Sequence, residues 1–230
     1  MPSLDLLITN GTIVDGRGGE PFIANVGIKD GWIVDVGTIA ASAAETIPAA
    51  GLLVTPGFVD VHTHYDGQAI WDEQTIGSSA HGVTTVVTGN CGVGFAPCRA
   101  DDRERLYALM EGVEDIPEIV MADGLTWDWE TFPEYLDALD RRRHDIDIAA
   151  QLPHSPLRVF VMGERGANRE TPTADDLTKM RALTCEAMEA GAIGFGTSRF
   201  LFHRTREGSV IPSYDAGTAE LERNEIWLNR

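Results

Sequence analysis

The sequence is short of lysine, of positive charge and of long apolar runs, and each shortage excludes a class of protein. Lys29 and Lys179 are the only lysines among 230 residues, and 36 acidic against 18 basic residues give a formal net charge of −18. A chain this acidic is not expected to bind nucleic acid or an anionic membrane surface. No stretch approaches the ~18 consecutive apolar residues that a membrane-spanning helix needs.

Cysteine is also scarce, with Cys91, Cys98 and Cys185 as its three members. The N-terminus has no basic residue before its first apolar stretch, and that stretch, 6–8, is too short for the apolar core of a signal peptide. An odd number of cysteines without an export signal argues against a disulfide framework. We therefore expect a reduced, cytoplasmic protein in which each cysteine is a packed thiol or a metal ligand.

The first 55 residues are predicted to form a small β-domain, one segment of a β-sandwich. Short apolar and β-branched runs alternate with turn-forming pairs, and the expected strands cover 5–9, 12–15, 25–29 and 32–36. Asn10 and Gly11 predict a turn between the first two runs. Asp30 and Gly31 predict a hairpin between the last two, because a type I′ turn needs positive φ at both central residues.

The pattern changes after Pro56, where buried strands alternate with helices. The predicted strands are 57–61, 84–88, 146–150 and 192–196, and the predicted helices are 73–81, 101–111, 132–142 and 173–190. Such alternation predicts a parallel sheet, for which a (β/α) barrel is one closure. Four strands make half of an eight-stranded barrel, and the tail 220–230 adds none. We predict an α/β fold, in which residues 56–230 form a partial TIM-type barrel, and expect the chain to be a fragment.

Two histidines follow the first of these strands directly. In an extended segment His62 and His64, two residues apart, point to the same side, at the end of the strand where barrel active sites lie. Imidazole is the commonest metal-binding side chain, so the pair predicts half of a metal site. The alternative is a pair of surface or capping histidines at a strand end.

At this point the sequence resembles a known family. Residues 56–64, Pro-Gly-Phe-Val-Asp-Val-His-Thr-His, are similar to the first-strand signature of the amidohydrolase superfamily. Residues 82–94, with the motif Gly-Asn-Cys-Gly, resemble its N-acyl-D-amino-acid deacylase (D-aminoacylase) branch, and the resemblance extends to about residue 197. It implies a zinc-dependent hydrolase that cleaves the linear C–N amide bond of a small N-acyl amino acid.

Cys91 is a candidate metal ligand because of this resemblance and because of its position. It lies three residues past the strand 84–88, at the same end of the sheet as the two histidines, where a thiolate completes a soft zinc site. Many amidohydrolases bridge two metals with a carbamylated lysine, but Lys29 lies in the β-domain and Lys179 in a helix. The D-aminoacylase branch has a cysteine in the bridging position, so the resemblance implies that Cys91 is a ligand. The alternative is a buried free thiol.

Two further residues are weaker candidates. Asp66 lies just past the histidines and is predicted to orient them, with a solvated loop as the alternative. His154 follows the strand 146–150 and is expected to line the pocket or to make a structural hydrogen bond. His203 is expected in a polar loop or substrate lid. Cys98 and Cys185 are expected to be packed thiols.

Some expected catalytic parts have no counterpart in the sequence. The family takes further histidine ligands and a catalytic aspartate from later strands, so the resemblance places the general base beyond Arg230 and implies that this chain alone is inactive. Two alternatives stay open: a cyclic amidohydrolase of the dihydropyrimidinase or hydantoinase kind, and a non-catalytic fragment or half of a split protein. Asn90-Cys91 and the shortage of lysine argue against the first alternative.

Overall fold

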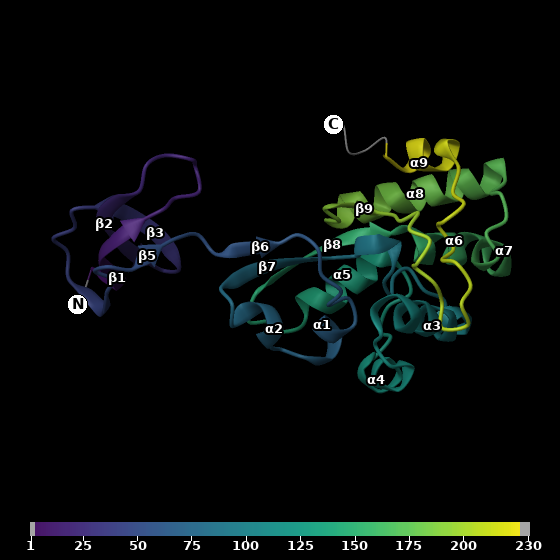
Figure 1. Ribbon diagram of the computed structural model, residues 1–230, viewed down its shortest axis with the longest axis horizontal. Helices are drawn as coiled ribbons and strands as arrows, with labels where there is room; N and C mark the ends of the chain where they lie inside the picture. The colour runs from purple at the N-terminus through teal and green to yellow at the C-terminus, as the bar shows by residue number, and fades with distance from the viewer. Residues whose placement is uncertain (1–2, 226–230) are drawn as a thin grey trace. The chain divides into compact units, whose positions relative to one another are not determined.

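A computed structural model of the chain describes residues 3–225 (Figure 1). These residues divide into two compact units, one ending at Gly57 and one beginning at Phe58, and each unit is described by itself. Among the described residues, no helix combines the length and the apolar character needed to cross a membrane.

The first unit is one mixed β-sheet. Its strands are β1 (Leu4–Ile13), β2 (Phe22–Lys29), β3 (Trp32–Gly37), β4 (Ala43–Pro48) and β5 (Leu53–Val54). They are ordered β3-β2-β1-β4, with β5 also pairing with β1. The two hairpin pairings are antiparallel, whereas β4 and β5 run parallel to β1. The five strands therefore form one sheet, with a buried cluster of Ile13, Ala24 and Val26, and the β-sandwich stays a prediction.

The two turn predictions in this unit had different outcomes. The Asp30-Gly31 hairpin is confirmed, because both residues have positive φ, 51° and 79°. The turn predicted at Asn10-Gly11 is wrong, because β1 runs through it as one strand. Asn10 does adopt a left-handed φ of 56°, but a register shift between Ile8 and Gly11 absorbs it as a bulge. The Asn10 N–H then donates to Oδ1 of Asn25 across the bulge.

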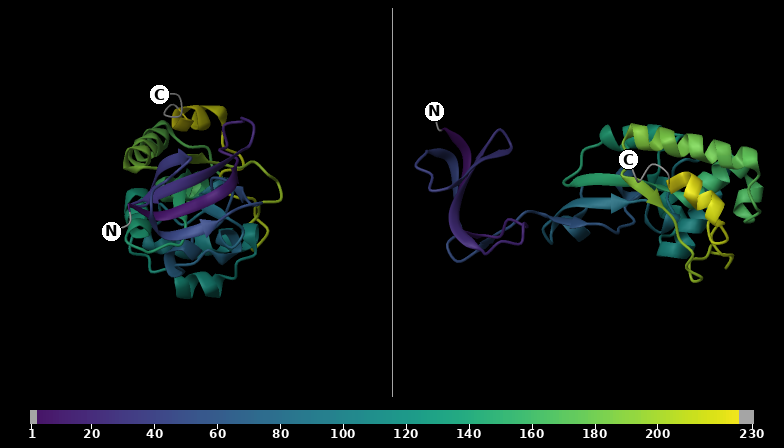
Figure 2. Two further views of the ribbon diagram at one scale, coloured as in Figure 1. Left: turned by 90° about the vertical axis from the view of Figure 1, so that its left-hand side faces the viewer. Right: turned by 90° about the horizontal axis from the view of Figure 1, so that it is seen from above.

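The second unit is built on a parallel sheet. Its strands β6 (Phe58–Asp60), β7 (Val83–Thr88), β8 (Asp147–Pro153) and β9 (Gly194–Gly196) lie side by side in chain order. Every neighbouring pair is parallel, and helical segments connect one strand to the next. This confirms the predicted partial (β/α) barrel. Figures 1 and 2 show that the long helix α8 (Ala174–Ala190), which precedes β9, runs alongside the strands.

Helices supply the other wall of the core. They are α1 (Gln68–Trp71), α2 (Ile76–Ser79), α3 (Arg103–Glu114), α4 (Glu118–Gly124), α5 (Phe132–Asp140), α6 (His154–Met162), α7 (Glu164–Ala167), α8 (Ala174–Ala190) and α9 (Thr218–Glu225), with 3₁₀ turns at Asn90–Gly92 and Ala100–Asp102. Buried side chains of α3, α5 and α8 pack with Ala150 and Leu152 of β8 in one continuous cluster. Helix α8 has the predicted Thr173 N-cap and a left-handed Gly191 at its end.

The helix predicted over 73–81 is confirmed only in its middle, because α2 covers no more than Ile76–Ser79. Asp72 accepts a hydrogen bond from the backbone of Gln74, which starts a turn rather than a helix. Thr75 is fully buried, and both its N–H and its hydroxyl donate to Asp145. These side-chain bonds compete with helix formation. Of the tail 220–230, residues 226–230 lie outside the described part of the chain.

Candidate metal centre

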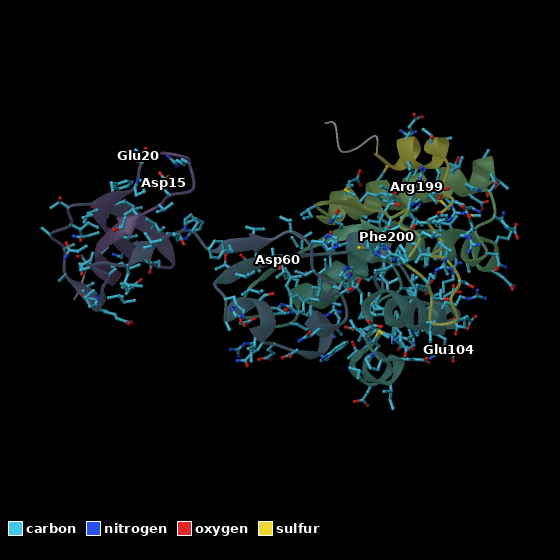
Figure 3. The ribbon with its side chains drawn as sticks, in the orientation of Figure 1. Asp15, Glu20, Asp60, Glu104, Arg199 and Phe200 are labelled. Atoms are coloured by element: carbon cyan, nitrogen blue, oxygen red, sulfur yellow. The ribbon has the colours of Figure 1, made fainter. Side chains whose placement is uncertain are left out.

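The predicted alternation places both histidines on one side of the strand end. His62 and His64 follow β6, on which Figure 3 labels Asp60, and their ring centroids are 5.5 Å apart. Thr63, between them, is buried and turns the other way, where its N–H and hydroxyl both donate to the carbonyl of Val87 on β7. These two hydrogen bonds of Thr63 therefore hold the end of β6 against β7.

Cys91 is presented by a tight turn directly after β7. Gly89 and Cys91 both have left-handed φ values, 78° and 55°. Asn90, between them, is buried and donates from Nδ2 to the carbonyls of Val87 and Thr63, while its Oδ1 accepts from Gln151 on β8. One amide side chain thus ties three neighbouring strand ends together and sets the direction of the thiol.

Glycine is required where this turn touches β8 and β9. A Cβ added to Gly89 would overlap the carbonyl oxygen of Gln151, and one on Gly196 would overlap the carbonyl oxygen of Gly89. The backbone of the turn therefore packs directly on two strands. This close approach leaves Cys91 little freedom to move away from the histidines.

The structure brings the three predicted ligands together. Nε2 of His62 lies 3.3 Å from Sγ of Cys91, and one potential ligand atom from each of His62, His64 and Cys91 lies within 4.8 Å of the others. Two ligands bound to zinc at ~2.0–2.3 Å each lie at comparable separations. Nδ1 of His64 is buried without a hydrogen-bond partner among the described residues. Two imidazoles, one of them with an unpartnered nitrogen, and a thiol fit a soft divalent metal ion.

The electrostatic setting keeps one of the imidazoles neutral. Burial, together with smaller effects of the neighbouring His62 and His203, lowers the pKa of His64 to about 4. Neutral imidazole is the form that binds metal ions. The 3.1 Å contact between Nε2 of His64 and Oε1 of Glu114 therefore joins a neutral ring to a carboxyl group and is not an ion pair.

The pKa values of the Cys91 thiol and the Asp66 carboxyl are raised, whereas that of His64 is lowered. Burial raises the pKa of Cys91, and the carboxylates of Glu114 and Asp66 add to the effect. Burial also raises the pKa of Asp66 to about 7, although the N–H of Gly89 opposes it. Without a cation, the site therefore disfavours negative charge, and a metal ion would reverse that preference.

The hydrogen bonds described for Asp66 and His154 join them to residues other than the three predicted ligands. Oδ1 of Asp66 accepts from the N–H of Gly89 at 2.7 Å, so its described bond supports the turn that carries Cys91. His154 is fully buried, with Nδ1 2.9 Å from the Thr197 hydroxyl and Nε2 2.8 Å from Glu220. The orienting role of Asp66 and the pocket role of His154 stay predictions.

A pocket of about 400 Å³ opens beside the cluster. It is lined by His62, Asn90, Cys91, Gln151, Phe195, Gly196, Thr197 and Ser198. Six of them lie at or just past the carboxyl ends of the parallel strands, and Gln151 and Phe195 lie inside β8 and β9 near the same ends, which is the functional end of a (β/α) barrel. His154 reaches this pocket indirectly, through its hydrogen bond with Thr197.

The remaining candidates lie in other surroundings. Cys98 is buried, and burial raises the pKa of its thiol to about 12. Cys185 lies half-buried in α8. His203 lies in the segment after β9, where Nδ1 is 2.9 Å from the Ser198 hydroxyl, and burial lowers its pKa. Figure 3 labels Arg199 and Phe200 in the same segment.

Sequence reasoning missed Glu114 and Gln151. Gln151 follows the predicted strand 146–150 at once, and its polar character at a strand end was a usable signal, but β8 continues to Pro153 and so places it inside the strand. Glu114 lies in a crossover helix, and its approach to His64 depends on how α3 packs. No local sequence pattern predicts the contact between Glu114 and His64.

Comparison with known proteins adds a family and three relatives. The model of the amidohydrolase family matches residues 45–227. An uncharacterised protein of Mycobacterium tuberculosis is 38% identical over 199 residues, which are 83% of this chain and 32% of that protein. A D-aminoacylase of Alcaligenes xylosoxydans is 34% identical over 197 residues, which are 85% of this chain and 38% of the relative.

A solved structure is similar as well. The N-acyl-D-glutamate deacylase of Bordetella bronchiseptica, complexed with zinc and a phosphonate inhibitor that mimics the tetrahedral intermediate, matches with a TM-score of 0.77 and 34% identity. The match covers 96% of this chain and 42% of that one. The resemblance seen in residues 56–64 and 82–94 is therefore confirmed. The chain spans about a third to two fifths of the curated relatives' length.

Proposed function

The chain belongs to the amidohydrolase family, and on that premise we propose that it forms the metal-binding part of an enzyme that hydrolyses linear C–N amide bonds. The proposed substrate is a small N-acyl-D-amino acid, which is cleaved to a carboxylate and a free amino acid. The observation that carries the proposal is the convergence of His62, His64 and Cys91 at the carboxyl ends of two parallel strands.

Zinc is the proposed ion, because two imidazoles and a thiolate suit it better than magnesium or calcium, which prefer oxygen ligands. When bound, zinc supplies Lewis-acid chemistry, since it polarises an amide carbonyl and makes water acidic enough to attack it. The zinc-bound deacylase of Bordetella bronchiseptica, which is 34% identical to this chain, supports the choice.

The chain's own side chains have separate tasks in this scheme. His62 and His64 offer nitrogen lone pairs, and His64 does so without first losing a proton. Cys91 gives up its proton and contributes a negative charge. Asn90 and Asp66 hold the turn that carries the thiol, through the bonds to Thr63, Val87 and Gly89. The pocket beside them receives the acyl amide.

The general base is proposed to lie outside these 230 residues, together with further metal ligands. Among the described residues, the group of potential ligands whose atoms lie within 4.8 Å of one another comprises only His62, His64 and Cys91. Residues 1–55 and 56–230 are proposed as a β-domain and the first half of the barrel. A cytoplasmic location also stays a proposal.

The test uses the chain expressed with any continuation of its reading frame past Arg230. We expect release of amino acid from N-acetyl-D-amino acids and none from a hydantoin ring. Cys91→Ala is expected to abolish the activity, whereas Cys98→Ala and Cys185→Ala keep most of it, because neither thiol lies beside the histidines.

Two results would contradict the proposal. Ring opening of a hydantoin without deacylation would favour the cyclic amidohydrolase reading. Unchanged activity and zinc content in Cys91→Ala would remove the thiolate from the site. A general loss of fold is recognised separately, because it would reduce the helical circular dichroism of that variant relative to Cys185→Ala.

A further inference from the structure

We infer that Thr197 recognises the N–H group of the substrate's amide, and that His154 is a positioning residue that makes the Thr197 hydroxyl a hydrogen-bond acceptor towards the pocket. The inference rests on the proposed function and adds to it the group on the substrate that the pocket distinguishes. It assigns a role to the buried side chains of His154, Arg158 and Glu220, which the metal centre does not use.

The sheet register places His154 and Thr197 side by side. Pro153, at the end of β8, pairs with Gly196, at the end of β9. The next residue along each chain segment is therefore a neighbour of the other at the carboxyl end of the sheet. Nδ1 of His154 lies 2.9 Å from the hydroxyl oxygen of Thr197 in a hydrogen bond. Thr197 itself is exposed and lines the pocket.

Thr197 also lies next to the candidate metal ligands. A Cβ added to Gly92 would come within 2.9 Å of Cα of Thr197. The turn that carries Cys91 therefore packs directly on the backbone of Thr197. His62 and Cys91 line the same pocket as Thr197. An amide bound at the metal centre would thus lie in the pocket that Thr197 lines.

The other nitrogen of His154 donates a hydrogen bond. Nε2 lies 2.8 Å from Oε1 of Glu220, and the two side chains are 0% and 1% exposed. The guanidinium of Arg158 pairs with the same carboxyl group. Burial opposes the ionisation of Glu220, but the His154 hydrogen bond and the Arg158 charge outweigh it and lower its pKa. A carboxylate only accepts hydrogen bonds, so Nε2 carries a hydrogen.

The imidazole ring carries a single hydrogen. Burial lowers the pKa of His154, and the charges of Arg158 and Arg199 add to this effect, although Glu220 opposes it. A neutral imidazole has one N–H donor and one lone-pair acceptor. With the hydrogen on Nε2, the lone pair belongs to Nδ1. The hydrogen between Nδ1 and Thr197 must then come from the hydroxyl group, which donates it to the ring.

A hydroxyl group that has donated its hydrogen offers its lone pairs to a ligand. The Thr197 oxygen therefore accepts a hydrogen bond from an N–H group in the pocket and repels an ester oxygen in the same place. The amide bond of an N-acyl amino acid carries one N–H, whereas the corresponding ester carries an oxygen there. A site that hydrogen-bonds a substrate N–H rejects the analogue that lacks it. We therefore expect Thr197 to favour amides over esters.

The first test reads the tautomer of His154 by ¹⁵N NMR in the metal-free protein, expressed with any continuation of its reading frame past Arg230. We expect a protonated Nε2 and an unprotonated, hydrogen-bonded Nδ1. In Thr197→Val, the Nδ1 resonance should shift towards that of a nitrogen without a hydrogen bond. Thr197→Ser should restore it, because serine also has a hydroxyl group. Thr178→Val, the same change at an exposed position of α8, is the matched control and should leave it unchanged.

The second test compares the dissociation constants of N-acetyl-D-alanine and O-acetyl-D-lactate in the same metal-free protein. The two probes have the same charge and differ in the N–H group that an oxygen replaces. One hydrogen bond corresponds to a preference of about 2–10-fold for the amide. Thr197→Val should lose this preference, whereas Thr197→Ser and Thr178→Val should keep it.

Three results would overturn the inference: an Nδ1–H tautomer of His154, an Nδ1 resonance that does not respond to Thr197→Val, or an amide preference that is absent or survives in that variant. Binding of neither probe would count against it as well. Failure of the proposed function looks different, because the amide is then bound with the expected preference but is not hydrolysed when zinc is added.

Discussion

At the scale of single residues, His64 and Cys91 differ in whether they must lose a proton before a metal ion can bind. The pKa of His64, lowered to about 4 by burial, leaves its ring neutral at pH 7 and above. The pKa of Cys91 is raised by burial and by the nearby Glu114 and Asp66 carboxylates, so the thiol keeps its proton around neutral pH. Only the thiol must then lose a proton when metal binds.

This difference predicts the pH dependence of metal binding. Between about pH 7.5 and 8.5, zinc binding should release about one proton per ion, and log affinity should rise by about one for each pH unit. Calorimetry in two buffers of different ionisation enthalpy measures the proton number directly. Cys91→Ala should remove the proton release, and a chain that releases no proton would show that Cys91 is not a ligand.

The residues that the sequence made visible are those whose position follows from the strand alone. His62 and His64 alternate with Thr63 because the chain is extended there, and Cys91 lies near them because parallel strands end at one edge. Glu114 and Glu220 were invisible as partners of His64 and His154, because both contacts depend on how distant helices pack.

At the scale of elements, a buried charge network holds α9 against α6. Glu220 of α9 and Arg158 of α6 are each 2% exposed or less and form an ion pair. His154, at the start of α6, contacts the same carboxylate and also Thr197, which lines the pocket. Burial opposes the ionisation of Glu220, but the His154 hydrogen bond and the Arg158 charge outweigh it and lower its pKa.

Removing the carboxylate should therefore be costly. Glu220→Ala leaves the Arg158 guanidinium buried without its anion, and breaking a buried pair in this way typically costs about 3–5 kcal/mol. We expect that loss in the free energy of unfolding in urea, with faster hydrogen exchange in α9. The loss should shrink as the pH falls through the lowered pKa of Glu220, because protonation weakens the pair in the unmodified chain too.

Glu222 offers a matched control on the same helix, because it is exposed. Glu222→Ala should stay within about 0.5 kcal/mol of the unmodified chain. If both variants lose the same small amount, the network does not hold α9.

Elements with several agreeing local signals were predicted well, and those decided by distant partners were not. Helix α8 combines a capping box with a left-handed Gly191, and the β2–β3 hairpin has two residues that tolerate positive φ. By contrast, Asp145 accepts hydrogen bonds from Thr75 from 70 positions away, and the helix predicted over 73–81 is reduced to Ile76–Ser79. The sequence predicted a turn at Asn10 instead of the observed bulge, because turns and bulges both favour residues that tolerate a positive φ.

At the scale of the whole molecule, the parallel sheet has two open edges. Among the described residues, β6 pairs only with β7 and β9 only with β8, and Phe58 and Val59 on β6 are 62% and 57% exposed. Unpaired edges with apolar side chains favour association with other strands. The two edges are open because the four described strands form a row in which the first and the last each have one neighbour.

We therefore expect the 230-residue chain to self-associate as its concentration rises in sedimentation velocity. Val59→Lys should shift the distribution toward the monomer, because a charge on an edge strand discourages pairing. Ile119→Lys, an equally drastic change at an exposed position of α4, should have little effect. A chain that stays monomeric at every concentration would refute the expectation.

The central claim is that His62, His64 and Cys91 together bind one divalent ion. The most direct measurement is the absorption spectrum of the Co²⁺-loaded chain, recorded for the unmodified protein, Cys91→Ala and Cys185→Ala. The account predicts a near-ultraviolet sulfur-to-cobalt charge-transfer band in the unmodified chain and in Cys185→Ala, and its loss in Cys91→Ala. A band that survives in Cys91→Ala, or that is missing from the unmodified chain, would contradict it.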